Sequence, residues 1–259
     1  MGGPGREADA RQHRRSLSRA LGRRDVRQRG PRRAADGADL RRDVPVRRAR
    51  RRAYRRLVAP DAGTVTDPRR EALDRLGLAL SRIEACREFA ALVPEVRTNF
   101  AFALPGAAGP GDVAAIDGRL TVVGGLPRAA GPLRFGASDH LARRVIELRR
   151  HDPAIACALN FRWHERILRF VEAWAEGRGL ELGTLDRAEE PVSLIGEDRA
   201  SMPWKVDRLV AACGGRVPPV FYEGRGWGKE PLFLLVGADP LTVADRAVDI
   251  ARRYHTWSG

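Results

Sequence analysis

Lysine is almost missing from this chain, whose 259 residues hold Lys205 and Lys229 beside 45 arginines. Cysteine is also scarce: Cys86, Cys157 and Cys213 are widely spaced, form no C-x-x-C pair and have no histidine at metal-ligand spacing. This pattern excludes a disulfide scaffold or a zinc ribbon and favours buried, reduced thiols. No apolar run reaches the ~20 residues of a membrane-spanning helix, and the start lacks the apolar middle of a signal peptide. We therefore expect a soluble, cytoplasmic protein that does not bind membranes.

The excess positive charge lies at the start of the chain. Residues 1–57 carry 20 arginines and 6 acidic side chains, whereas residues 58–259 carry 27 basic and 27 acidic side chains. The arginine-rich start has neither helical nor strand periodicity, so we expect residues 1–66 to be a disordered tail and residues 67–259 to form one domain. The tail is either a solvated extension, or a stretch upstream of the true start, or an arm that binds nucleic acid or a membrane surface. Its shortage of aromatic residues disfavours the arm.

Helical and extended patterns alternate after residue 67. Asp67-Pro68 is a capping residue followed by proline, and the apolar residues behind it follow helical spacing, which predicts an amphipathic helix over residues 68–91. Apolar runs bounded by Gly, Pro or Asp predict strands at 100–104, 120–123, 155–161, 180–185, 220–222 and 232–236. Further helices are predicted at 139–150, 163–177, 203–213 and 240–254. The alternation predicts a layered α/β domain, and the missing glycine fingerprint after the first strand disfavours a Rossmann fold.

A glycine-bearing turn, Arg134-Phe135-Gly136-Ala137-Ser138-Asp139-His140, leads into the predicted helix at 139–150. The start of a helix is a natural site for phosphate, because unpaired backbone N–H groups and the helix dipole attract anions. His140 lies at this positive end, which favours the neutral imidazole, a form that suits proton transfer or donation to an oxygen. His140 is therefore a candidate catalytic residue, although a single histidine can also be structural.

A second loop of the same kind is Gly224-Arg225-Gly226-Trp227-Gly228-Lys229-Glu230-Pro231. It is not a Walker A loop, because Glu223 and Glu230 occupy the places of the motif's first glycine and of its Ser or Thr. The backbone N–H groups of the three glycines, with Lys229 as a point charge, could instead hold a phosphate or diphosphate. The alternative is a surface turn.

Polar residues also follow two other predicted strands. Asp186, Glu189 and Glu190 lie at the end of one of them and form either a magnesium site or a solvated turn. Asn160 and Arg162 end another strand, where polar side chains often face a binding cleft.

Taken together, several segments in the same order resemble the ThiN-type thiamine-phosphate synthase domain, over about residues 70–257. The matching segments are Pro94–Asn99 with Ala103–Gly106, Val113–Arg119, Arg134–His140, Asp152-Pro153, Ala158–Arg162, Asp186-Arg187, Glu189–Pro191 and Gly226–Pro231. The resemblance implies a three-layer α/β fold of the aldolase and epimerase type, with a mixed, largely antiparallel sheet, and a homodimer. It implies the joining of hydroxymethylpyrimidine diphosphate and hydroxyethylthiazole phosphate to give thiamine phosphate and pyrophosphate.

The resemblance also implies an essential arginine and an essential histidine, which match Arg119 and His140. Around this catalytic pair, the residues predicted to bind substrate or phosphate are Asn99, Arg134, Gly136, Ser138, Asn160, Arg162, Gly224, Gly226, Gly228 and Lys229. Mg²⁺ is expected on the diphosphate, with Asp186, Glu189 and Glu190 as its candidate protein ligands.

One alternative function stays open. Some domains of this type are attached to DNA-binding modules and act as thiamine-phosphate sensors that regulate transcription; these tend to lack the catalytic pair and the extra N-terminal helix. The predicted helix at 68–91 and the presence of Arg119 and His140 favour the enzyme. Nucleic acid is expected as a partner only under the alternative, for which residues 1–57 show no readable helix-turn-helix.

Overall fold

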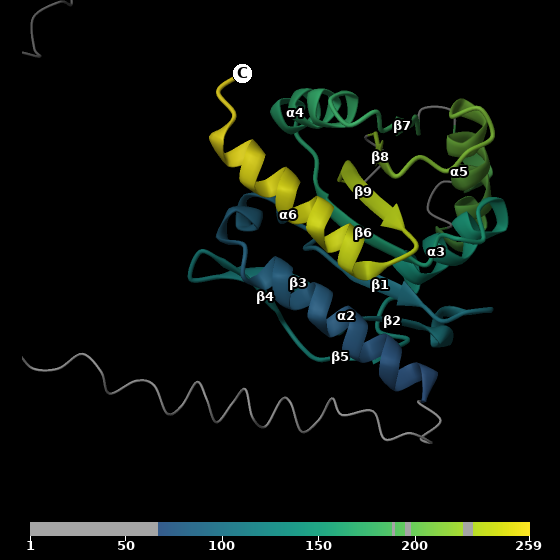
Figure 1. Ribbon diagram of the computed structural model, residues 1–259. Helices are drawn as coiled ribbons and strands as arrows, with labels where there is room; N and C mark the ends of the chain where they lie inside the picture. Colours follow the sequence, from purple (N-terminus) through teal and green to yellow (C-terminus); the bar gives the residue numbers. More distant parts are fainter. Residues whose placement is uncertain (1–66, 188–189, 195–197, 225–229) are drawn as a thin grey trace, which may run out of the picture. The chain divides into compact units, whose positions relative to one another are not determined.

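The computed structural model describes residues 67–187, 190–194, 198–224 and 230–259, and Figure 1 shows how their helices and strands are arranged. The predicted tail, residues 1–66, lies outside the described residues. Helix α2 spans Pro68–Glu84 and begins as expected, because the Asp67 side chain accepts a hydrogen bond from the Arg69 backbone N–H at 3.0 Å. The prediction that this helix continues to residue 91 is wrong. The backbone becomes extended at Cys86, and a separate 3-10 helix, η1, spans Arg87–Leu92.

A seven-stranded sheet forms the middle of the domain. Its strands are β1 (Phe100–Ala103), β2 (Val113–Ile116), β5 (Leu133–Phe135), β6 (Cys157–Arg162), β7 (Leu182–Leu185), β8 (Val220–Glu223) and β9 (Leu232–Gly237), in the order β5-β2-β1-β6-β9-β8-β7. Every neighbouring pair is antiparallel except β7 with β8, which is parallel. A separate hairpin pairs β3 (Leu120–Val123) with β4 (Leu126–Ala129). The mixed, largely antiparallel sheet confirms the predicted fold class.

Helices cover both faces of the sheet (Figure 1). One face packs against α2, α4 (Glu165–Glu176) and α6 (Pro240–Thr256), and the other against α3 (Asp139–His151) and α5 (Asp198–Ala212). Helix α5 begins at Asp198 and contains Pro203, so the start predicted at residue 203 is too late. The short 3-10 helices η2 (Pro110–Asp112) and η3 (Val192–Leu194) lie in the connections.

The central strand β6 is buried on both faces, and its side chains alternate between the two cores. Cys157, Leu159 and Phe161 pack on the α2/α4/α6 side, whereas Ala158 packs on the α3/α5 side. Because side chains of a strand alternate, Asn160 lies on the same face as Ala158. A polar residue is therefore placed beneath α3 at the end of a central strand.

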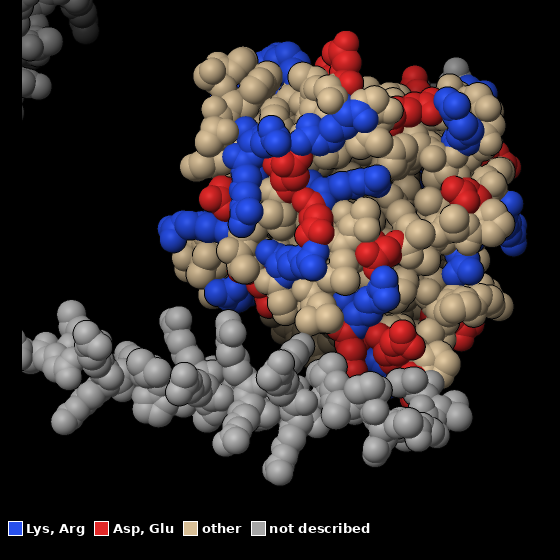
Figure 2. Space-filling view, in the orientation of Figure 1, with Lys and Arg blue, Asp and Glu red and all other residues tan. Residues whose placement is uncertain are grey.

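Arginines and acidic side chains are interleaved on the face of the molecule formed by α2 and α6 (Figure 2). Arg75 pairs with Asp239 at 2.7 Å and Arg82 with Asp245 at 2.5 Å, which links the two neighbouring helices. Exposed pairs of this kind contribute about 0–1 kcal/mol each. Among the described residues, no helix is both long enough and apolar enough to cross a membrane.

Candidate active site

A cavity of about 240 Å³ opens on the α3/α5 side of the sheet, near the ends of β6 and β8, the beginning of β9 and the first turn of α3. Its described lining consists of Val96, Asn99, Arg119, Ser138, His140, Leu141, Arg144, Asn160, Arg187, Glu223, Glu230, Leu232 and Leu234. The lining combines apolar side chains with convergent charged groups, which is typical of a small-molecule site.

Arg119 reaches this cavity from the turn between β2 and β3. Its backbone has a left-handed φ of 68°, directly after Gly118 with φ of 73°. A non-glycine residue in this region carries strain on the order of 1–3 kcal/mol, a feature that gathers at functional sites. The Arg119 guanidinium donates a hydrogen bond to the Val96 carbonyl oxygen at 2.5 Å. The side chain is therefore aimed by its own backbone and by the segment that contains Val96.

His140 is the second residue of α3 and lies on the cavity side of the helix start. Ser138 caps the helix by accepting a hydrogen bond from the Leu141 backbone N–H at 3.4 Å. Asp139 is held on the helix surface by Arg143, whose guanidinium binds it at 2.8 and 2.9 Å and lowers the pKa of that carboxyl. The helix thus presents His140 and Ser138 to the cavity.

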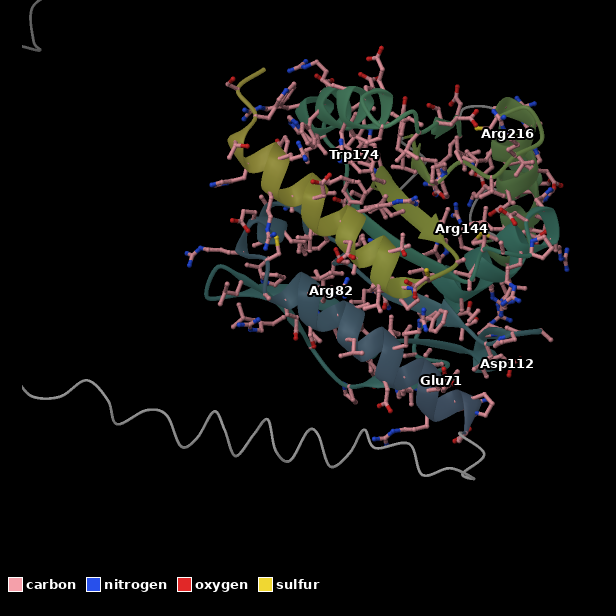
Figure 3. The ribbon with its side chains drawn as sticks, in the orientation of Figure 1. Glu71, Arg82, Asp112, Arg144, Trp174 and Arg216 are labelled. Carbon is pink, nitrogen blue, oxygen red and sulfur yellow. The ribbon has the colours of Figure 1, made fainter. Side chains whose placement is uncertain are left out.

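Three charged side chains form a buried group in the cavity wall. Glu223, at the end of β8, accepts hydrogen bonds from Arg144 of α3 through one carboxylate oxygen and from Arg187 through the other. The exposed fractions of the side chains are 1% for Arg144, 4% for Arg187 and 5% for Glu223. Arg144, labelled in Figure 3, points from α3 into the interior. Two guanidinium groups and one carboxylate therefore meet in a region of low solvent access.

Asn99 and Asn160 hold the backbone that borders the cavity. The Asn160 side chain accepts a hydrogen bond from the Asn99 backbone N–H at 2.8 Å and donates one to the Arg97 carbonyl at 3.1 Å. The Asn99 side-chain oxygen accepts from the Phe100 and Ile116 backbone N–H groups at 2.8 and 3.1 Å. Both amides line the cavity, yet each is already bonded to backbone. Their first role is thus to join β1, β2 and β6.

Glu230 fixes the same border from the other side of the cavity. Its carboxylate accepts hydrogen bonds from the backbone N–H groups of Glu95 and Val96 at 3.2 and 3.1 Å. Since Val96 in turn accepts from Arg119, the position of Arg119 depends on this segment.

Several predicted residues lie away from the cavity or outside the described residues. Arg134 binds Asp117 at 2.8 and 3.2 Å and, with Gly136 and Arg162, lies outside the described lining. Gly224 donates its backbone N–H to the Leu185 carbonyl at 3.0 Å and is likewise outside it. Gly226, Gly228 and Lys229 belong to residues 225–229, which are not described.

The described carboxylates do not fit a resident magnesium ion. Glu190 forms an ion pair with the buried Lys205 at 3.3 Å, and Asp186 lines a different cavity, of about 320 Å³, beside Arg208. Glu189 lies outside the described residues. Within the described part of the chain, no three His, Cys, Asp or Glu side chains are grouped so that they could hold a metal ion.

Comparison with known proteins identifies the family. The chain matches the model of the family "Thiamine-phosphate synthase ThiN" over residues 75–249. It is 36% identical over 188 residues to the thiamine-phosphate synthase ThiN of Methanothermobacter thermautotrophicus, covering 72% of this chain and 96% of that protein. The chain belongs to the ThiN family.

Two further comparisons agree in sequence and in fold. The bifunctional thiamine biosynthesis protein ThiDN of Methanocaldococcus jannaschii is 29% identical over 167 residues, which are 64% of this chain and 37% of that protein. The crystal structure of the C-terminal domain of phosphomethylpyrimidine kinase superposes with a TM-score of 0.66 and 33% identity, covering 70% of this chain and 98% of that domain. The predicted resemblance to the ThiN family is therefore confirmed.

Sequence reasoning did not single out all of the residues that line the cavity of this ThiN domain. Arg144 follows Leu141 by three residues, so helical spacing already placed an arginine on the apolar face of α3. Glu223 ends the apolar run Val220–Tyr222, on the same face as the buried Phe221. A charge at an inward-facing position was the signal for both residues.

Proposed function

We propose that this chain joins hydroxymethylpyrimidine diphosphate to hydroxyethylthiazole phosphate and releases thiamine phosphate and pyrophosphate. One observation carries the proposal beyond family membership: Arg119 and His140, from different elements, line the same cavity together with two buried arginines. The reaction uses two phosphorylated substrates, and the guanidinium groups of the described lining outnumber its carboxylates, Glu223 and Glu230, so they can bind the substrate phosphates.

The proposed chemistry requires stabilisation of a leaving group. The C–O bond between the pyrimidine methylene and the diphosphate breaks, the bonding electrons stay with the diphosphate, and the thiazole nitrogen donates its pair to the methylene carbon. Negative charge therefore grows on the leaving oxygen. Arg119 would bind this anionic group, and His140 would donate a hydrogen bond or a proton to the leaving oxygen.

The apolar lining would protect the reacting carbon. Leu141, Leu232 and Leu234 border the cavity, and the last is almost fully buried. A wall of leucines would pack against the pyrimidine and thiazole rings and keep water from capturing the methylene carbon in place of the thiazole nitrogen.

Substitution of the catalytic pair tests the proposal. Arg119→Ala should lower kcat roughly 10²- to 10³-fold, because it removes a charge that stabilises the transition state. His140→Ala should lower it roughly 10²- to 10⁴-fold, as expected for a group that donates a hydrogen bond or a proton to the leaving oxygen. Circular dichroism and thermal unfolding of both variants should match the wild type. Wild-type turnover in either variant would refute its role.

Magnesium would enter bound to the diphosphate, since the described carboxylates do not fit a resident ion. This proposal predicts turnover that depends on Mg²⁺, without tight Mg²⁺ binding to the protein alone in a calorimetric titration. Tight binding in the absence of diphosphate would contradict it.

The remaining proposals concern the whole chain. Residues 67–259 would hold the full activity, so that truncation of residues 1–66 leaves kcat unchanged.

The protein would act as a homodimer in the cytoplasm, where the buried free thiols of Cys86, Cys157 and Cys213 stay reduced. Light scattering on the purified chain measures the oligomer directly.

A further inference from the structure

We propose that Glu223 is a positioning residue that holds Arg144 and Arg187 as a phosphate-binding pair in the cavity wall. The identity of the ligand as a substrate phosphate rests on the proposed function, whereas the binding of an anion by this arginine pair does not. The three residues come from three separate parts of the chain: α3, the segment that follows β7, and the end of β8.

Geometry carries the first step. The two carboxylate oxygens of Glu223 are divided between the arginines, so one side chain holds a donor of each guanidinium group. All three side chains line the same cavity as Arg119 and His140. A guanidinium has five N–H donors in a planar fork that fits phosphate oxygens, so an arginine that binds Glu223 can also bind an anion in the cavity that it lines.

The energetics of burial carry the second step. Three charged groups with at most 5% exposure are costly to desolvate, and buried ion groups of this kind are often no more stabilising than apolar side chains of similar volume. Stability alone therefore does not account for two arginines around one carboxylate at a cavity wall. Recognition of an anion does, because a buried, oriented guanidinium binds phosphate more strongly than an exposed one.

The substrates offer two sources of this phosphate chemistry, the diphosphate of the pyrimidine and the monophosphate of the thiazole. If the arginine pair holds the diphosphate, variants should raise the KM for the pyrimidine substrate. If it holds the monophosphate, they should raise the KM for the thiazole substrate. A KM effect confined to one substrate thus identifies which phosphate group binds there.

The deciding experiment is calorimetric titration of the full chain with pyrophosphate and, separately, with inorganic phosphate. Glu223→Gln removes a negative charge, so a purely electrostatic role predicts tighter anion binding. Loss of positioning predicts the opposite, and we expect the affinity for at least one of the two probes to fall about tenfold or more. Unchanged or tighter binding of both probes by a folded Glu223→Gln protein overturns the positioning role.

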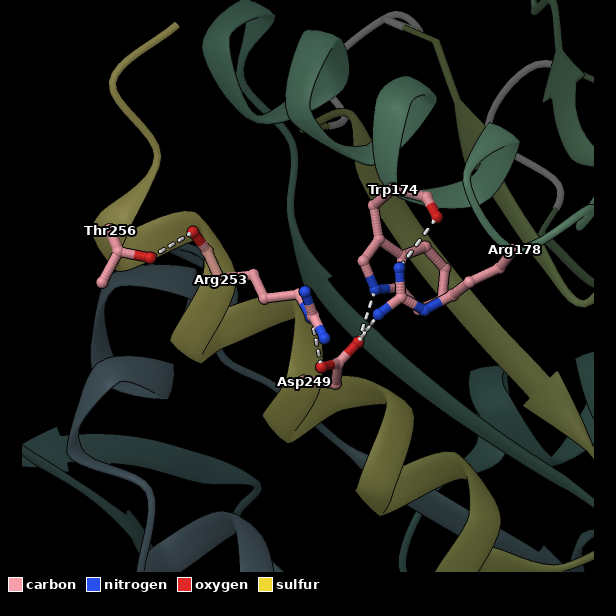
Figure 4. A network of polar contacts seen from close by, with 5 residues as sticks. All are labelled: Trp174, Arg178, Asp249, Arg253 and Thr256. Carbon is pink, nitrogen blue, oxygen red and sulfur yellow. Dashed lines mark hydrogen bonds and ion pairs between the residues drawn. The ribbon is translucent and has the colours of Figure 1, made fainter.

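Charge-conserving variants keep the proposal testable if Glu223→Gln does not fold. Arg144→Lys and Arg187→Lys retain the charge but lose the planar fork, and each should weaken binding of the same probe about tenfold. Wild-type affinity in both variants would refute the proposal. Asp249→Asn is the matched control: Asp249 also binds two arginines, Arg178 and Arg253, but lies between α4 and α6 away from the cavity (Figure 4). Its anion affinity should equal that of the wild type.

The anion titrations and the assay of thiamine phosphate formation test the two proposals separately. If the wild type binds pyrophosphate through the arginine pair but forms no thiamine phosphate, the arginine pair stands and the proposed function fails. If it forms thiamine phosphate and all three variants bind both probes and turn over like the wild type, the proposed function stands and the arginine pair fails.

Discussion

Replacement of Asn160 by alanine tests whether the cavity border is built by backbone hydrogen bonds. The Asn160 side chain is buried and bridges the Asn99 backbone N–H and the Arg97 carbonyl. Each lost hydrogen bond contributes about 0.5–1.5 kcal/mol, and a buried donor left without a partner costs about 1–3 kcal/mol. We therefore expect Asn160→Ala to lower the free energy of unfolding by about 2–4 kcal/mol.

Urea denaturation followed by tryptophan fluorescence measures this change, with the m-value checked for constancy. Thr256→Ala is the control, because its hydroxyl donates to the Arg253 carbonyl at 3.2 Å on the exposed end of α6 (Figure 4). It should cost less than about 0.5 kcal/mol. If Asn160→Ala unfolds like the wild type but binds substrate more weakly, the amide serves the ligand rather than the backbone, and our reasoning is wrong.

Three further predictions follow from other parts of the structure. Lys205→Met should destabilise the fold by about 3–5 kcal/mol, because it leaves the Glu190 carboxylate without its fully buried ion-pair partner. Adding Glu190→Gln should recover part of this loss, as measured by urea denaturation. No recovery would show that the ion pair does not stabilise the fold. Burial would raise the pKa of Asp249, but hydrogen bonds from Trp174 and Arg253 outweigh burial and lower that pKa. The stability that these contacts provide is present above about pH 3.9, the pKa of an unfolded aspartate, and is lost as the pH falls through the lower pKa of the folded state. Asp249→Asn should therefore lose less stability than the wild type in acid unfolding, and an identical pH profile would contradict this. Gly183→Ala should lower the free energy of unfolding by about 1–3 kcal/mol through overpacking, since a Cβ would lie 2.5 Å from Pro218 Cγ and 2.9 Å from Leu209 Cδ1. An unchanged melting temperature would show that the neighbouring residues move to accommodate the methyl group.

The capped helices and the buried strands could be predicted from sequence because their signals are local. Asp67-Pro68 and Asp239-Pro240 begin α2 and α6, and the apolar run at β6 lies at the centre of the sheet. Strands β2, β4 and β5 were not predicted as strands. They are three or four residues long: β2 and β5 are strands because they hydrogen-bond to each other, and β2 also to β1, whereas β4 pairs with β3 across the turn at Gly124-Gly125.

The cavity could be predicted only in part, for the same reason. Arg119 and His140 were indicated by resemblance to a family, and their common cavity depends on how β2, β3 and α3 pack. The three-residue group around Glu223 joins positions 144, 187 and 223, and no local pattern connects them. Conversely, Arg134 belongs to a turn that the sequence predicted to bind phosphate, yet in the structure it forms an ion pair with Asp117.

The central claim is that this chain makes thiamine phosphate at the cavity that contains Arg119 and His140. The most direct test incubates the purified chain with hydroxymethylpyrimidine diphosphate, hydroxyethylthiazole phosphate and Mg²⁺, and quantifies thiamine phosphate and pyrophosphate. We predict equal amounts of the two products with the wild type and almost none with His140→Ala. A folded wild-type protein that binds thiamine phosphate but forms no product would contradict the account and favour a sensor of thiamine phosphate.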